Sequence, residues 1–192
     1  DLAYSSTSAL ALNSGTINDA ASNAATLTLA SPGASNSLSN SKALVIDGVI
    51  PTVSSVTSTT SNGTHKLGDV IEITVSFSET MTVTGTPQLT LETGSSDATV
   101  NYVSGSGSST LTFNYTIGAG EASSDLDYAS TSALALNGGT IKDGAGNAAT
   151  LTLASPGATN SLGANKALVV DGIVPTVSSV TSTTSNGSYK VD

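Results

Sequence analysis

The chain has 192 residues, of which only 10% are charged, and its 14 acidic residues outnumber the five lysines and arginines together. It lacks the clustered basic residues that nucleic acids and anionic membrane surfaces require, so we expect neither as a partner. No apolar run approaches the roughly 20 residues of a membrane-spanning helix. The absence of cysteine, the acidic balance and the many Ser, Thr and Gly residues favour an exposed extracellular setting.

The first 50 residues contain short strand patterns separated by turns. Thr16–Ile17 predicts a short strand, and Asp19–Asn23 predicts a tight acidic loop after it. Ala25–Ala30 alternates with period two, which predicts a half-buried strand. Ala43–Ile46 predicts a further short apolar strand.

The middle of the chain has a more regular alternation of apolar and polar residues. In Asp69–Phe77 the pattern places Ile71, Ile73 and Val75 on one face, which predicts one buried face and one wet face. No stretch of ten or more residues has the helical period, and turn residues punctuate the strands, so we expect an all-β antiparallel sandwich. The predicted strands are Val53–Thr60, Asp69–Phe77, Met81–Thr84, Gln88–Glu92, Ala98–Val103 and Thr110–Ile117.

The chain then repeats its own sequence. Residues 125–192 match residues 1–68 without a gap, at an offset of 124, and 51 of the 68 positions are identical. Self-similarity at a fixed offset is typical of tandem arrays, which are built for reach rather than for catalysis. We therefore expect an excerpt of a longer protein with a repeat length of about 124 residues.

Pro51 and Pro175 mark the joints between the predicted repeats, because proline cannot donate to a ladder and keeps the preceding residue extended. Cutting the chain there predicts three parts. Residues 1–50 form the C-terminal part of one repeat, residues 51–174 form a complete repeat, and residues 175–192 form the N-terminal part of the next.

One candidate metal site is the loop Asp143-Gly-Ala-Gly-Asn147. A carboxylate, an amide oxygen and backbone carbonyls exposed by the glycines could coordinate Ca²⁺. Asp19 and Asn23 occupy the same positions in the first copy. The alternative is an Asx-type turn, in which Asp and Asn bond to nearby N–H groups.

A second candidate lies at the joints. Asp47 and Asp171 each precede a joint proline by four residues. Either acid could bridge through Ca²⁺ to an acid of the adjoining repeat, such as Asp69 or Glu79, and so stiffen the joint. The alternative is a strand end capped by an Asp-Gly turn.

No arrangement of residues predicts catalysis. Glu121, Asp125 and Asp127 form a local acidic cluster, and paired carboxylates can serve hydrolysis. However, Asp127 is replaced by Ala3 in the other copy, so we expect a solvated strand edge. The single histidine, His65, is replaced by tyrosine in the other copy, and no nucleophile–base pair is apparent. We expect that the chain is not an enzyme.

Several motifs together point to a known family. They are Pro51-Thr-Val-Ser-Ser-Val56, Val75-Ser-Phe-Ser-Glu79, Thr84-Gly-Thr-Pro-Gln-Leu-Thr-Leu-Glu92 and Leu136-Asn-Gly-Gly-Thr-Ile-Lys-Asp-Gly-Ala-Gly-Asn147. In this order they resemble the bacterial immunoglobulin-like tandem repeats of giant surface adhesins and extracellular fibre proteins. The resemblance implies a sandwich of seven or more strands, export to the cell surface, a role as stalk or fibre body, and calcium that rigidifies the string.

The expected partners are neighbouring repeats of the same chain. Lateral self-association into fibres would use Ser and Thr faces and exposed edge strands. The alternative function is a carbohydrate- or receptor-binding adhesion module, which would need a concave aromatic patch or a loop insertion. The five tyrosines are scattered along the sequence at positions compatible with a core.

Overall fold

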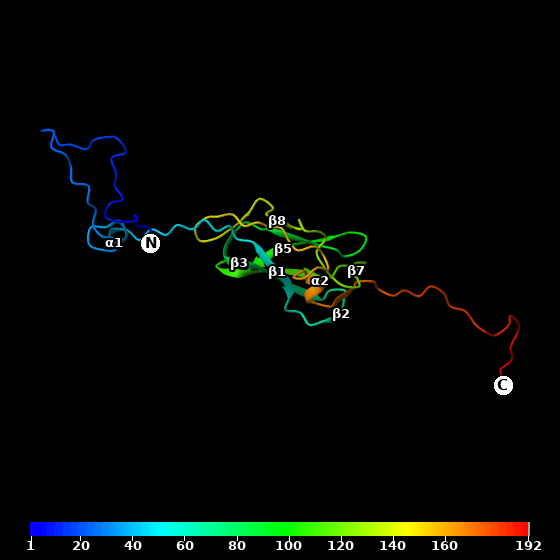
Figure 1. Cartoon of the computed structure of the whole chain (residues 1–192). Coiled ribbons are helices and arrows are strands. Elements are labelled where there is room, and N and C mark those ends of the chain that lie inside the picture. The colour runs from blue at the N-terminus through cyan, green and yellow to red at the C-terminus, as the bar shows by residue number, and fades with distance from the viewer. Residues whose placement is uncertain (192) are drawn as a thin grey trace. The chain divides into compact units, whose positions relative to one another are not determined.

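The computed structural model describes residues 1–191, which fall into a first unit, Asp1–Val49, and a second unit that begins at Ile50. The first unit carries helix α1 (Leu38–Ser41), and the second carries all the described strands and helix α2 (Leu162–Asn165) (Figure 1). The fold is all-β, as predicted. The strands are β1 (Val53–Ser58), β2 (Gly63–Lys66), β3 (Val70–Thr84), β4 (Gln88–Leu91), β5 (Ala98–Ser104), β6 (Ser108–Thr116), β7 (Ala122–Ser123), β8 (Leu134–Ala135), β9 (Thr140–Lys142) and β10 (Leu168–Asp171).

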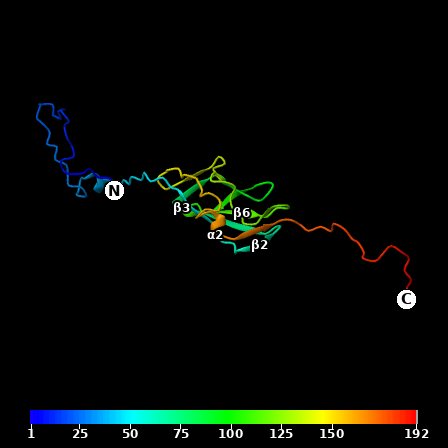
Figure 2. The same cartoon turned by 45° about the vertical axis from the view of Figure 1, so that its right-hand side comes forward.

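The strands form two sheets. The larger sheet has the order β1-β3-β6-β5-β4-β8, and β9 pairs with the last residues of β3. All of these pairs are antiparallel. The smaller sheet has the order β2-β10-β7, with β10 parallel to β2 and antiparallel to β7. Figure 2 shows the short helix α2, which contacts β1 and comes shortly before β10 in the chain.

β3 is the strand around which the larger sheet is built, because β1, β6 and β9 all pair with it. Ile71, Ile73 and Val75 are fully buried, which confirms the face predicted from the alternation. Thr74, on the opposite face, is also buried. The strand continues to Thr84, where the pattern predicts two separate strands, because an irregularity after Ser76 lets it change partner from β6 to β9.

The core lies entirely within the second unit. Its aromatic and sulfur-containing members come from β3, β6 and the loop after β7, and Leu, Ile and Val side chains fill the space between them. The buried apolar residues run from Val56 to Val170, so this segment holds a complete core of its own. Neither helix in residues 1–191 has the length and apolar character needed to cross a membrane.

The first unit repeats the local turns of the second without its strands. Tyr4 Oη donates to the carbonyl oxygen of Ala30 at 2.5 Å, and Tyr128 Oη donates to Ala154 at 2.6 Å in the second copy. Both short helices begin at a serine whose side chain accepts a backbone N–H of the first turn. In each copy both partners of these bonds lie within the repeated segment, so both copies form them.

No strand forms in residues 1–49, so the strands predicted at Thr16–Ile17, Ala25–Ala30 and Ala43–Ile46 are wrong. In the second copy, β9 pairs with β3, and β10 lies between β2 and β7. The first copy contains no counterparts of β3 or β7, and a segment with a strand pattern forms a strand only with a partner. Ala149–Ala154, the counterpart of Ala25–Ala30, makes only an isolated bridge through Thr150.

Candidate acidic sites at the two ends of the second unit

The chain is attached to one end of the second unit through Pro51 and Thr52. Thr150 N donates to the Pro51 carbonyl oxygen at 2.8 Å, and Ser78 N donates to the Thr52 carbonyl oxygen at 2.9 Å. Thr52 N in turn donates to the Ser78 hydroxyl at 3.1 Å. We call this region the Pro51 end.

The chain leaves the strands at Gly172, which is also held by backbone hydrogen bonds. Gly172 N donates to the Glu121 carbonyl oxygen at 2.8 Å, and Gly120 N donates to the Gly172 carbonyl oxygen at 3.0 Å. The loop that supplies these groups follows Ile117, whose N–H donates to the Asp69 carbonyl oxygen just before β3. We call this region the Gly172 end.

Asp143 and Asn147 lie at the Pro51 end and close a tight turn. Asp143 Oδ1 accepts the backbone N–H groups of Ala145 at 2.9 Å and Asn147 at 2.8 Å, and Oδ2 accepts the Asn147 side-chain amide at 2.8 Å. Asp19 and Asn23 make the same set of bonds in the first unit. Both copies therefore contain the Asx-type turn that was the alternative to a metal loop.

Hydrogen bonding also sets the charge of these carboxyl groups. In the first unit, the side-chain amide of Asn23, followed by its backbone N–H, lowers the pKa of Asp19. Desolvation by itself would raise the pKa of Asp143, but the donors of Asn147, Gly146 and Ala145 outweigh it and hold this pKa below its ordinary value. Both turns thus favour the ionised carboxylate.

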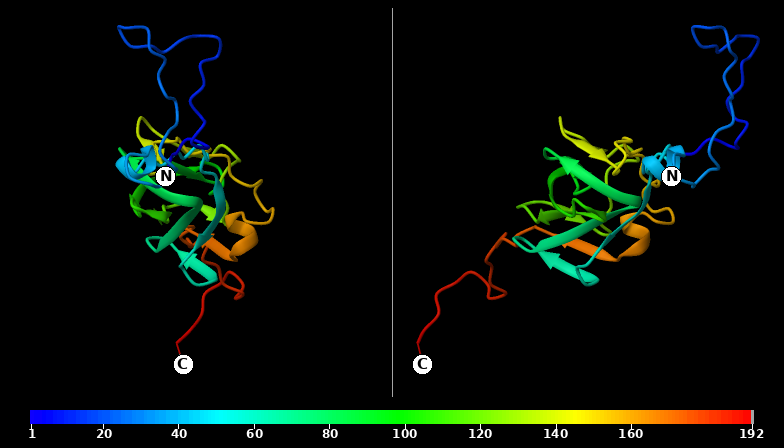
Figure 3. Two further views of the ribbon diagram at one scale, coloured as in Figure 1. Left: turned by 60° about the vertical axis from the view of Figure 1, so that its left-hand side comes forward. Right: turned by 90° about the vertical axis from the view of Figure 1, so that its left-hand side faces the viewer.

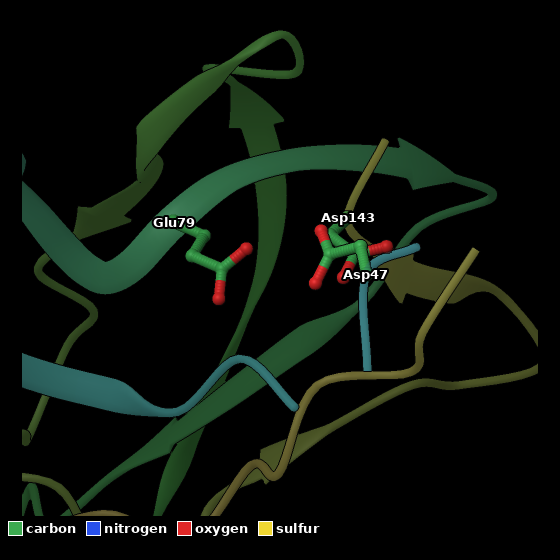
Figure 4. A group of neighbouring side chains, drawn as sticks. All are labelled: Asp47, Glu79 and Asp143. Atoms are coloured by element: carbon green, nitrogen blue, oxygen red, sulfur yellow. The ribbon is translucent and has the colours of Figure 1, made fainter. Parts of the chain in front are cut away.

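Glu79 is brought beside Asp143 because β9 pairs with the end of β3. A carboxylate oxygen of Glu79 lies within 4.8 Å of one of Asp143 (Figure 4, which also draws Asp47 of the first unit). Two carboxylates at this separation suit a hard cation, but Ca²⁺ takes six to eight oxygens. Because the Asp143 oxygens already accept three N–H bonds, the pair supplies only part of a coordination shell.

Asp69 lies at the Gly172 end and is paired with a lysine. Lys66 N donates to Asp69 Oδ2 at 3.0 Å, and Lys66 Nζ lies 3.4 Å from Asp69 Oδ1. The backbone bond from Lys66, aided by the lysine charge and a weaker effect of His65, lowers the pKa of Asp69 despite some desolvation. Asp69 directly precedes β3 and lies at the Gly172 end, whereas Glu79 lies within β3 beside Asp143 at the Pro51 end, so the two acids do not share a site.

The acids that precede the joints have a common local geometry. Asp171 Oδ1 accepts the backbone N–H of Ile173 at 3.1 Å, and Asp47 Oδ1 accepts that of Val49 at 3.1 Å. This is the Asp-Gly turn that was the alternative to an ion bridge. It fixes the direction in which the chain leaves β10.

Asp127 is a buried, hydrogen-bonded carboxylate that the sequence pattern does not identify correctly. It is only 8% exposed, and it accepts the backbone N–H groups of Tyr128 and Gly157, each at 2.9 Å. The prediction of a solvated edge is therefore wrong for Asp127. The Ser-Pro-Gly turn that ends in Gly157 is visible in the sequence, but nothing local relates it to a residue 30 positions earlier.

Glu121 is also engaged rather than solvated. Its Oε2 accepts the Tyr115 hydroxyl and the Gly118 backbone N–H, each at 2.6 Å. The carboxylate borders an open cleft of about 470 Å³ between β5 and β6, which pair only near Tyr102 and Ser104 and separate beyond it. The polar residues lining this cleft are Thr99, Asn101, Asn114, Thr116 and Glu121.

Comparison with known proteins gives no assignment. No family model, curated protein or solved structure matches this chain.

Proposed function

We propose that this chain is part of the stalk or fibre body of a large secreted bacterial surface protein. In this proposal, tandem immunoglobulin-like β-sandwiches stack end to end at the cell surface and extend whatever they carry away from it. The repeated sequence, the complete core of residues 56–170 and the acidic, cysteine-free composition support it.

One observation carries the proposal. The chain joins the second unit at the Pro51 end and leaves it at the Gly172 end, on the opposite side of the strands (Figure 3). Asp69 and Ser78, which mark these ends along β3, are nine residues apart, or roughly 30 Å in an extended strand. A copy connected in this way adds its length to the string instead of folding back on its neighbour.

Lateral association of several strings is the next part of the proposal. Thr57, Thr74 and Thr112 occupy matching positions on three neighbouring strands of the larger sheet. Thr74 is buried, so only Thr57 and Thr112, which are partly exposed and uncharged, could contact a neighbouring string. Cross-strand pairs of this kind also stabilise the sheet by about 0.2–1 kcal/mol each.

Calcium is the proposed stiffening ion at the loops and joints. The Glu79 and Asp143 carboxylates would repel each other less with a divalent cation between them. Melting the chain with added Ca²⁺ and with EDTA tests this part. We expect the melting temperature to rise with Ca²⁺ and this rise to be reduced by Glu79→Gln, but not by the control Glu92→Gln. If EDTA leaves the melting temperature unchanged, the calcium hypothesis is contradicted, whereas the stalk hypothesis is unaffected.

The length of a two-copy chain tests whether successive copies extend end to end. A chain with residues 51–174 twice in succession, keeping the native joint, should give a maximum dimension in small-angle scattering that is close to twice that of one copy. A compact, folded-back pair of the same mass would contradict the proposal.

The β5–β6 cleft favours a second candidate, a glycan-binding module, because its hydroxyl, amide and carboxylate groups match the hydrogen-bonding needs of sugars. Screening the chain on a glycan array tests this candidate. Specific binding that is lost in Asn101→Ala and Asn114→Ala would favour it over a purely mechanical role.

A further inference from the structure

We propose that successive copies dock rigidly, through an apolar contact centred on Ile173 and Val174. The partner is the Pro51 end of the following copy, and the contact surface is the Gly172 end. This inference rests on the proposed function, and it names the surface that turns a string of domains into a rod.

The connection between two successive copies is short. Gly172 is held by two backbone bonds to Gly120 and Glu121. Residues 175–184 are identical to residues 51–60, so we expect Pro175 to be fixed in its own copy as Pro51 is. Only two residues lie between these anchors, and three Cα–Cα steps span at most about 11 Å. The two ends are therefore forced into contact.

The connection is also stiff. The backbone N–H of Ile173 is bonded to the Asp171 carboxylate at 3.1 Å. Val174 precedes proline, which restricts it to extended conformations, and its β-branched side chain restricts it further. Asp47 bonds to Val49 in the same way in the first copy. Few backbone torsions are thus left to act as a hinge.

The connection and the Gly172 end expose apolar side chains. Ile173 is 62% exposed and Val174 is 60% exposed, and Leu67 is 40% exposed at the same end. The other joint carries Val49 and Ile50, the same two side chains in reverse order, so its apolar volume is unchanged. Flexible linkers are rich in Gly and Ser, whereas two large aliphatic residues at each joint indicate a surface that is covered.

The charges at the two ends set the conditions for docking. The Pro51 end carries Glu79, Asp143 and Lys142, and the Gly172 end carries Asp171, Glu121 and the Asp69–Lys66 pair, so both ends have a net negative charge. Docking brings these acidic groups closer, so the apolar contact acts against electrostatic repulsion. Added salt screens that repulsion, and we expect the joint to become more rigid as the ionic strength rises.

The experiment uses the chain with residues 51–174 twice in succession. Cysteine is absent from the native chain, so Asn101→Cys in each copy provides two unique spin-label sites. Pulsed electron paramagnetic resonance should give one narrow distance distribution. Replacing Ile173 and Val174 by serine should broaden it clearly, whereas Val103→Ser, which changes a residue 54% exposed on β5, should leave it narrow.

Melting curves give a second readout of the same contact. We expect the two-copy chain to melt a few degrees above a single copy, and the serine double variant to lose this difference. A broad distribution in the native sequence, or one that the serine variant does not change, overturns the docking. If the mean distance still corresponds to an extended pair, the extender proposal survives; a short mean distance overturns that proposal as well.

Discussion

Gly172 and Glu121 are joined by a backbone hydrogen bond of 2.8 Å, and a Cβ at position 172 would lie only 2.2 Å from the carbonyl oxygen of Gly118. Gly172→Ala must therefore move backbone rather than a side chain. We expect it to lower the free energy of unfolding by about 1–3 kcal/mol, the usual cost of overpacking. Urea unfolding followed by circular dichroism measures this loss.

Gly144→Ala is the matched control for that substitution, because nothing lies within 4 Å of a Cβ built at position 144. We expect its unfolding free energy to stay within about 0.5 kcal/mol of the native value. Equal effects of the two substitutions would mean that the close approach at Gly172 does not constrain the end of the unit.

The Asp143 turn predicts that the stability of the fold decreases at acidic pH. Its folded pKa is lowered, so its contribution to stability is present above the unfolded value of about 3.9 and is lost as the pH falls through the folded pKa. Melting temperatures of the native chain should decline as the pH is taken from 5 to about 2. Asp143→Asn should be less stable at neutral pH, and its melting temperature should fall less with acid. A parallel decline of both proteins would contradict the role given to this carboxylate.

Tyr128 and Tyr115 predict that the stability of the fold decreases at alkaline pH. Burial, with a smaller effect of Asp127, raises the pKa of Tyr128 to about 12, and burial and the Glu121 carboxylate raise that of Tyr115 well above its usual range. A raised pKa contributes stability that is present below pH 10 or so and is lost as the pH rises through the folded value. The chain has no tryptophan, so near-ultraviolet absorbance reports tyrosinate directly. Tyr128→Phe should remove one late step of this titration, and an unchanged late step would contradict the assignment.

Most strands between residues 53 and 117 could be predicted because period-two alternation is a local signal, although the pattern does not predict β2, and β3 joins two strands that it predicts separately. Ile71, Ile73 and Val75 are buried as their spacing indicates. The pairing of strands could not be predicted in this way, because alternation specifies a face and not a partner. The same limit explains why Ala43–Ile46 carries a strand pattern in the first unit but forms no strand there.

In the candidate sites, too, contacts between neighbouring residues could be predicted from the sequence, whereas contacts between distant residues could not. The Asp143–Asn147 turn depends on five adjacent residues, and it was one of the two alternatives that the motif left open. The proximity of Glu79 and Asp143 depends on the pairing of Thr82 with Lys142, which brings together residues that are far apart in the sequence. The spacing of residues within either segment therefore does not predict that Glu79 and Asp143 lie close together.

The two copies of the sequence differ at Asp127, and we expect this difference to affect the stability of the fold. The Asp127 carboxylate accepts the N–H groups of Tyr128 and Gly157 in a site that is almost fully buried, and the first copy has Ala3 at this position. Asp127→Ala leaves the Gly157 donor without its partner, so we expect a loss of about 1–3 kcal/mol in the free energy of unfolding.

Asp125→Ala is the control for Asp127→Ala, since Asp125 is exposed and lies two residues earlier on the same loop. We expect it to change the unfolding free energy by less than about 0.5 kcal/mol. Asp127→Asn should fall between the two, because an amide keeps the shape of the side chain but offers a single acceptor oxygen. Denaturant unfolding of the three variants gives this order directly. If Asp127→Ala is as stable as Asp125→Ala, the hydrogen bond to Gly157 does not stabilise the fold. The difference between Asp127 and Ala3 would then not affect the free energy of unfolding.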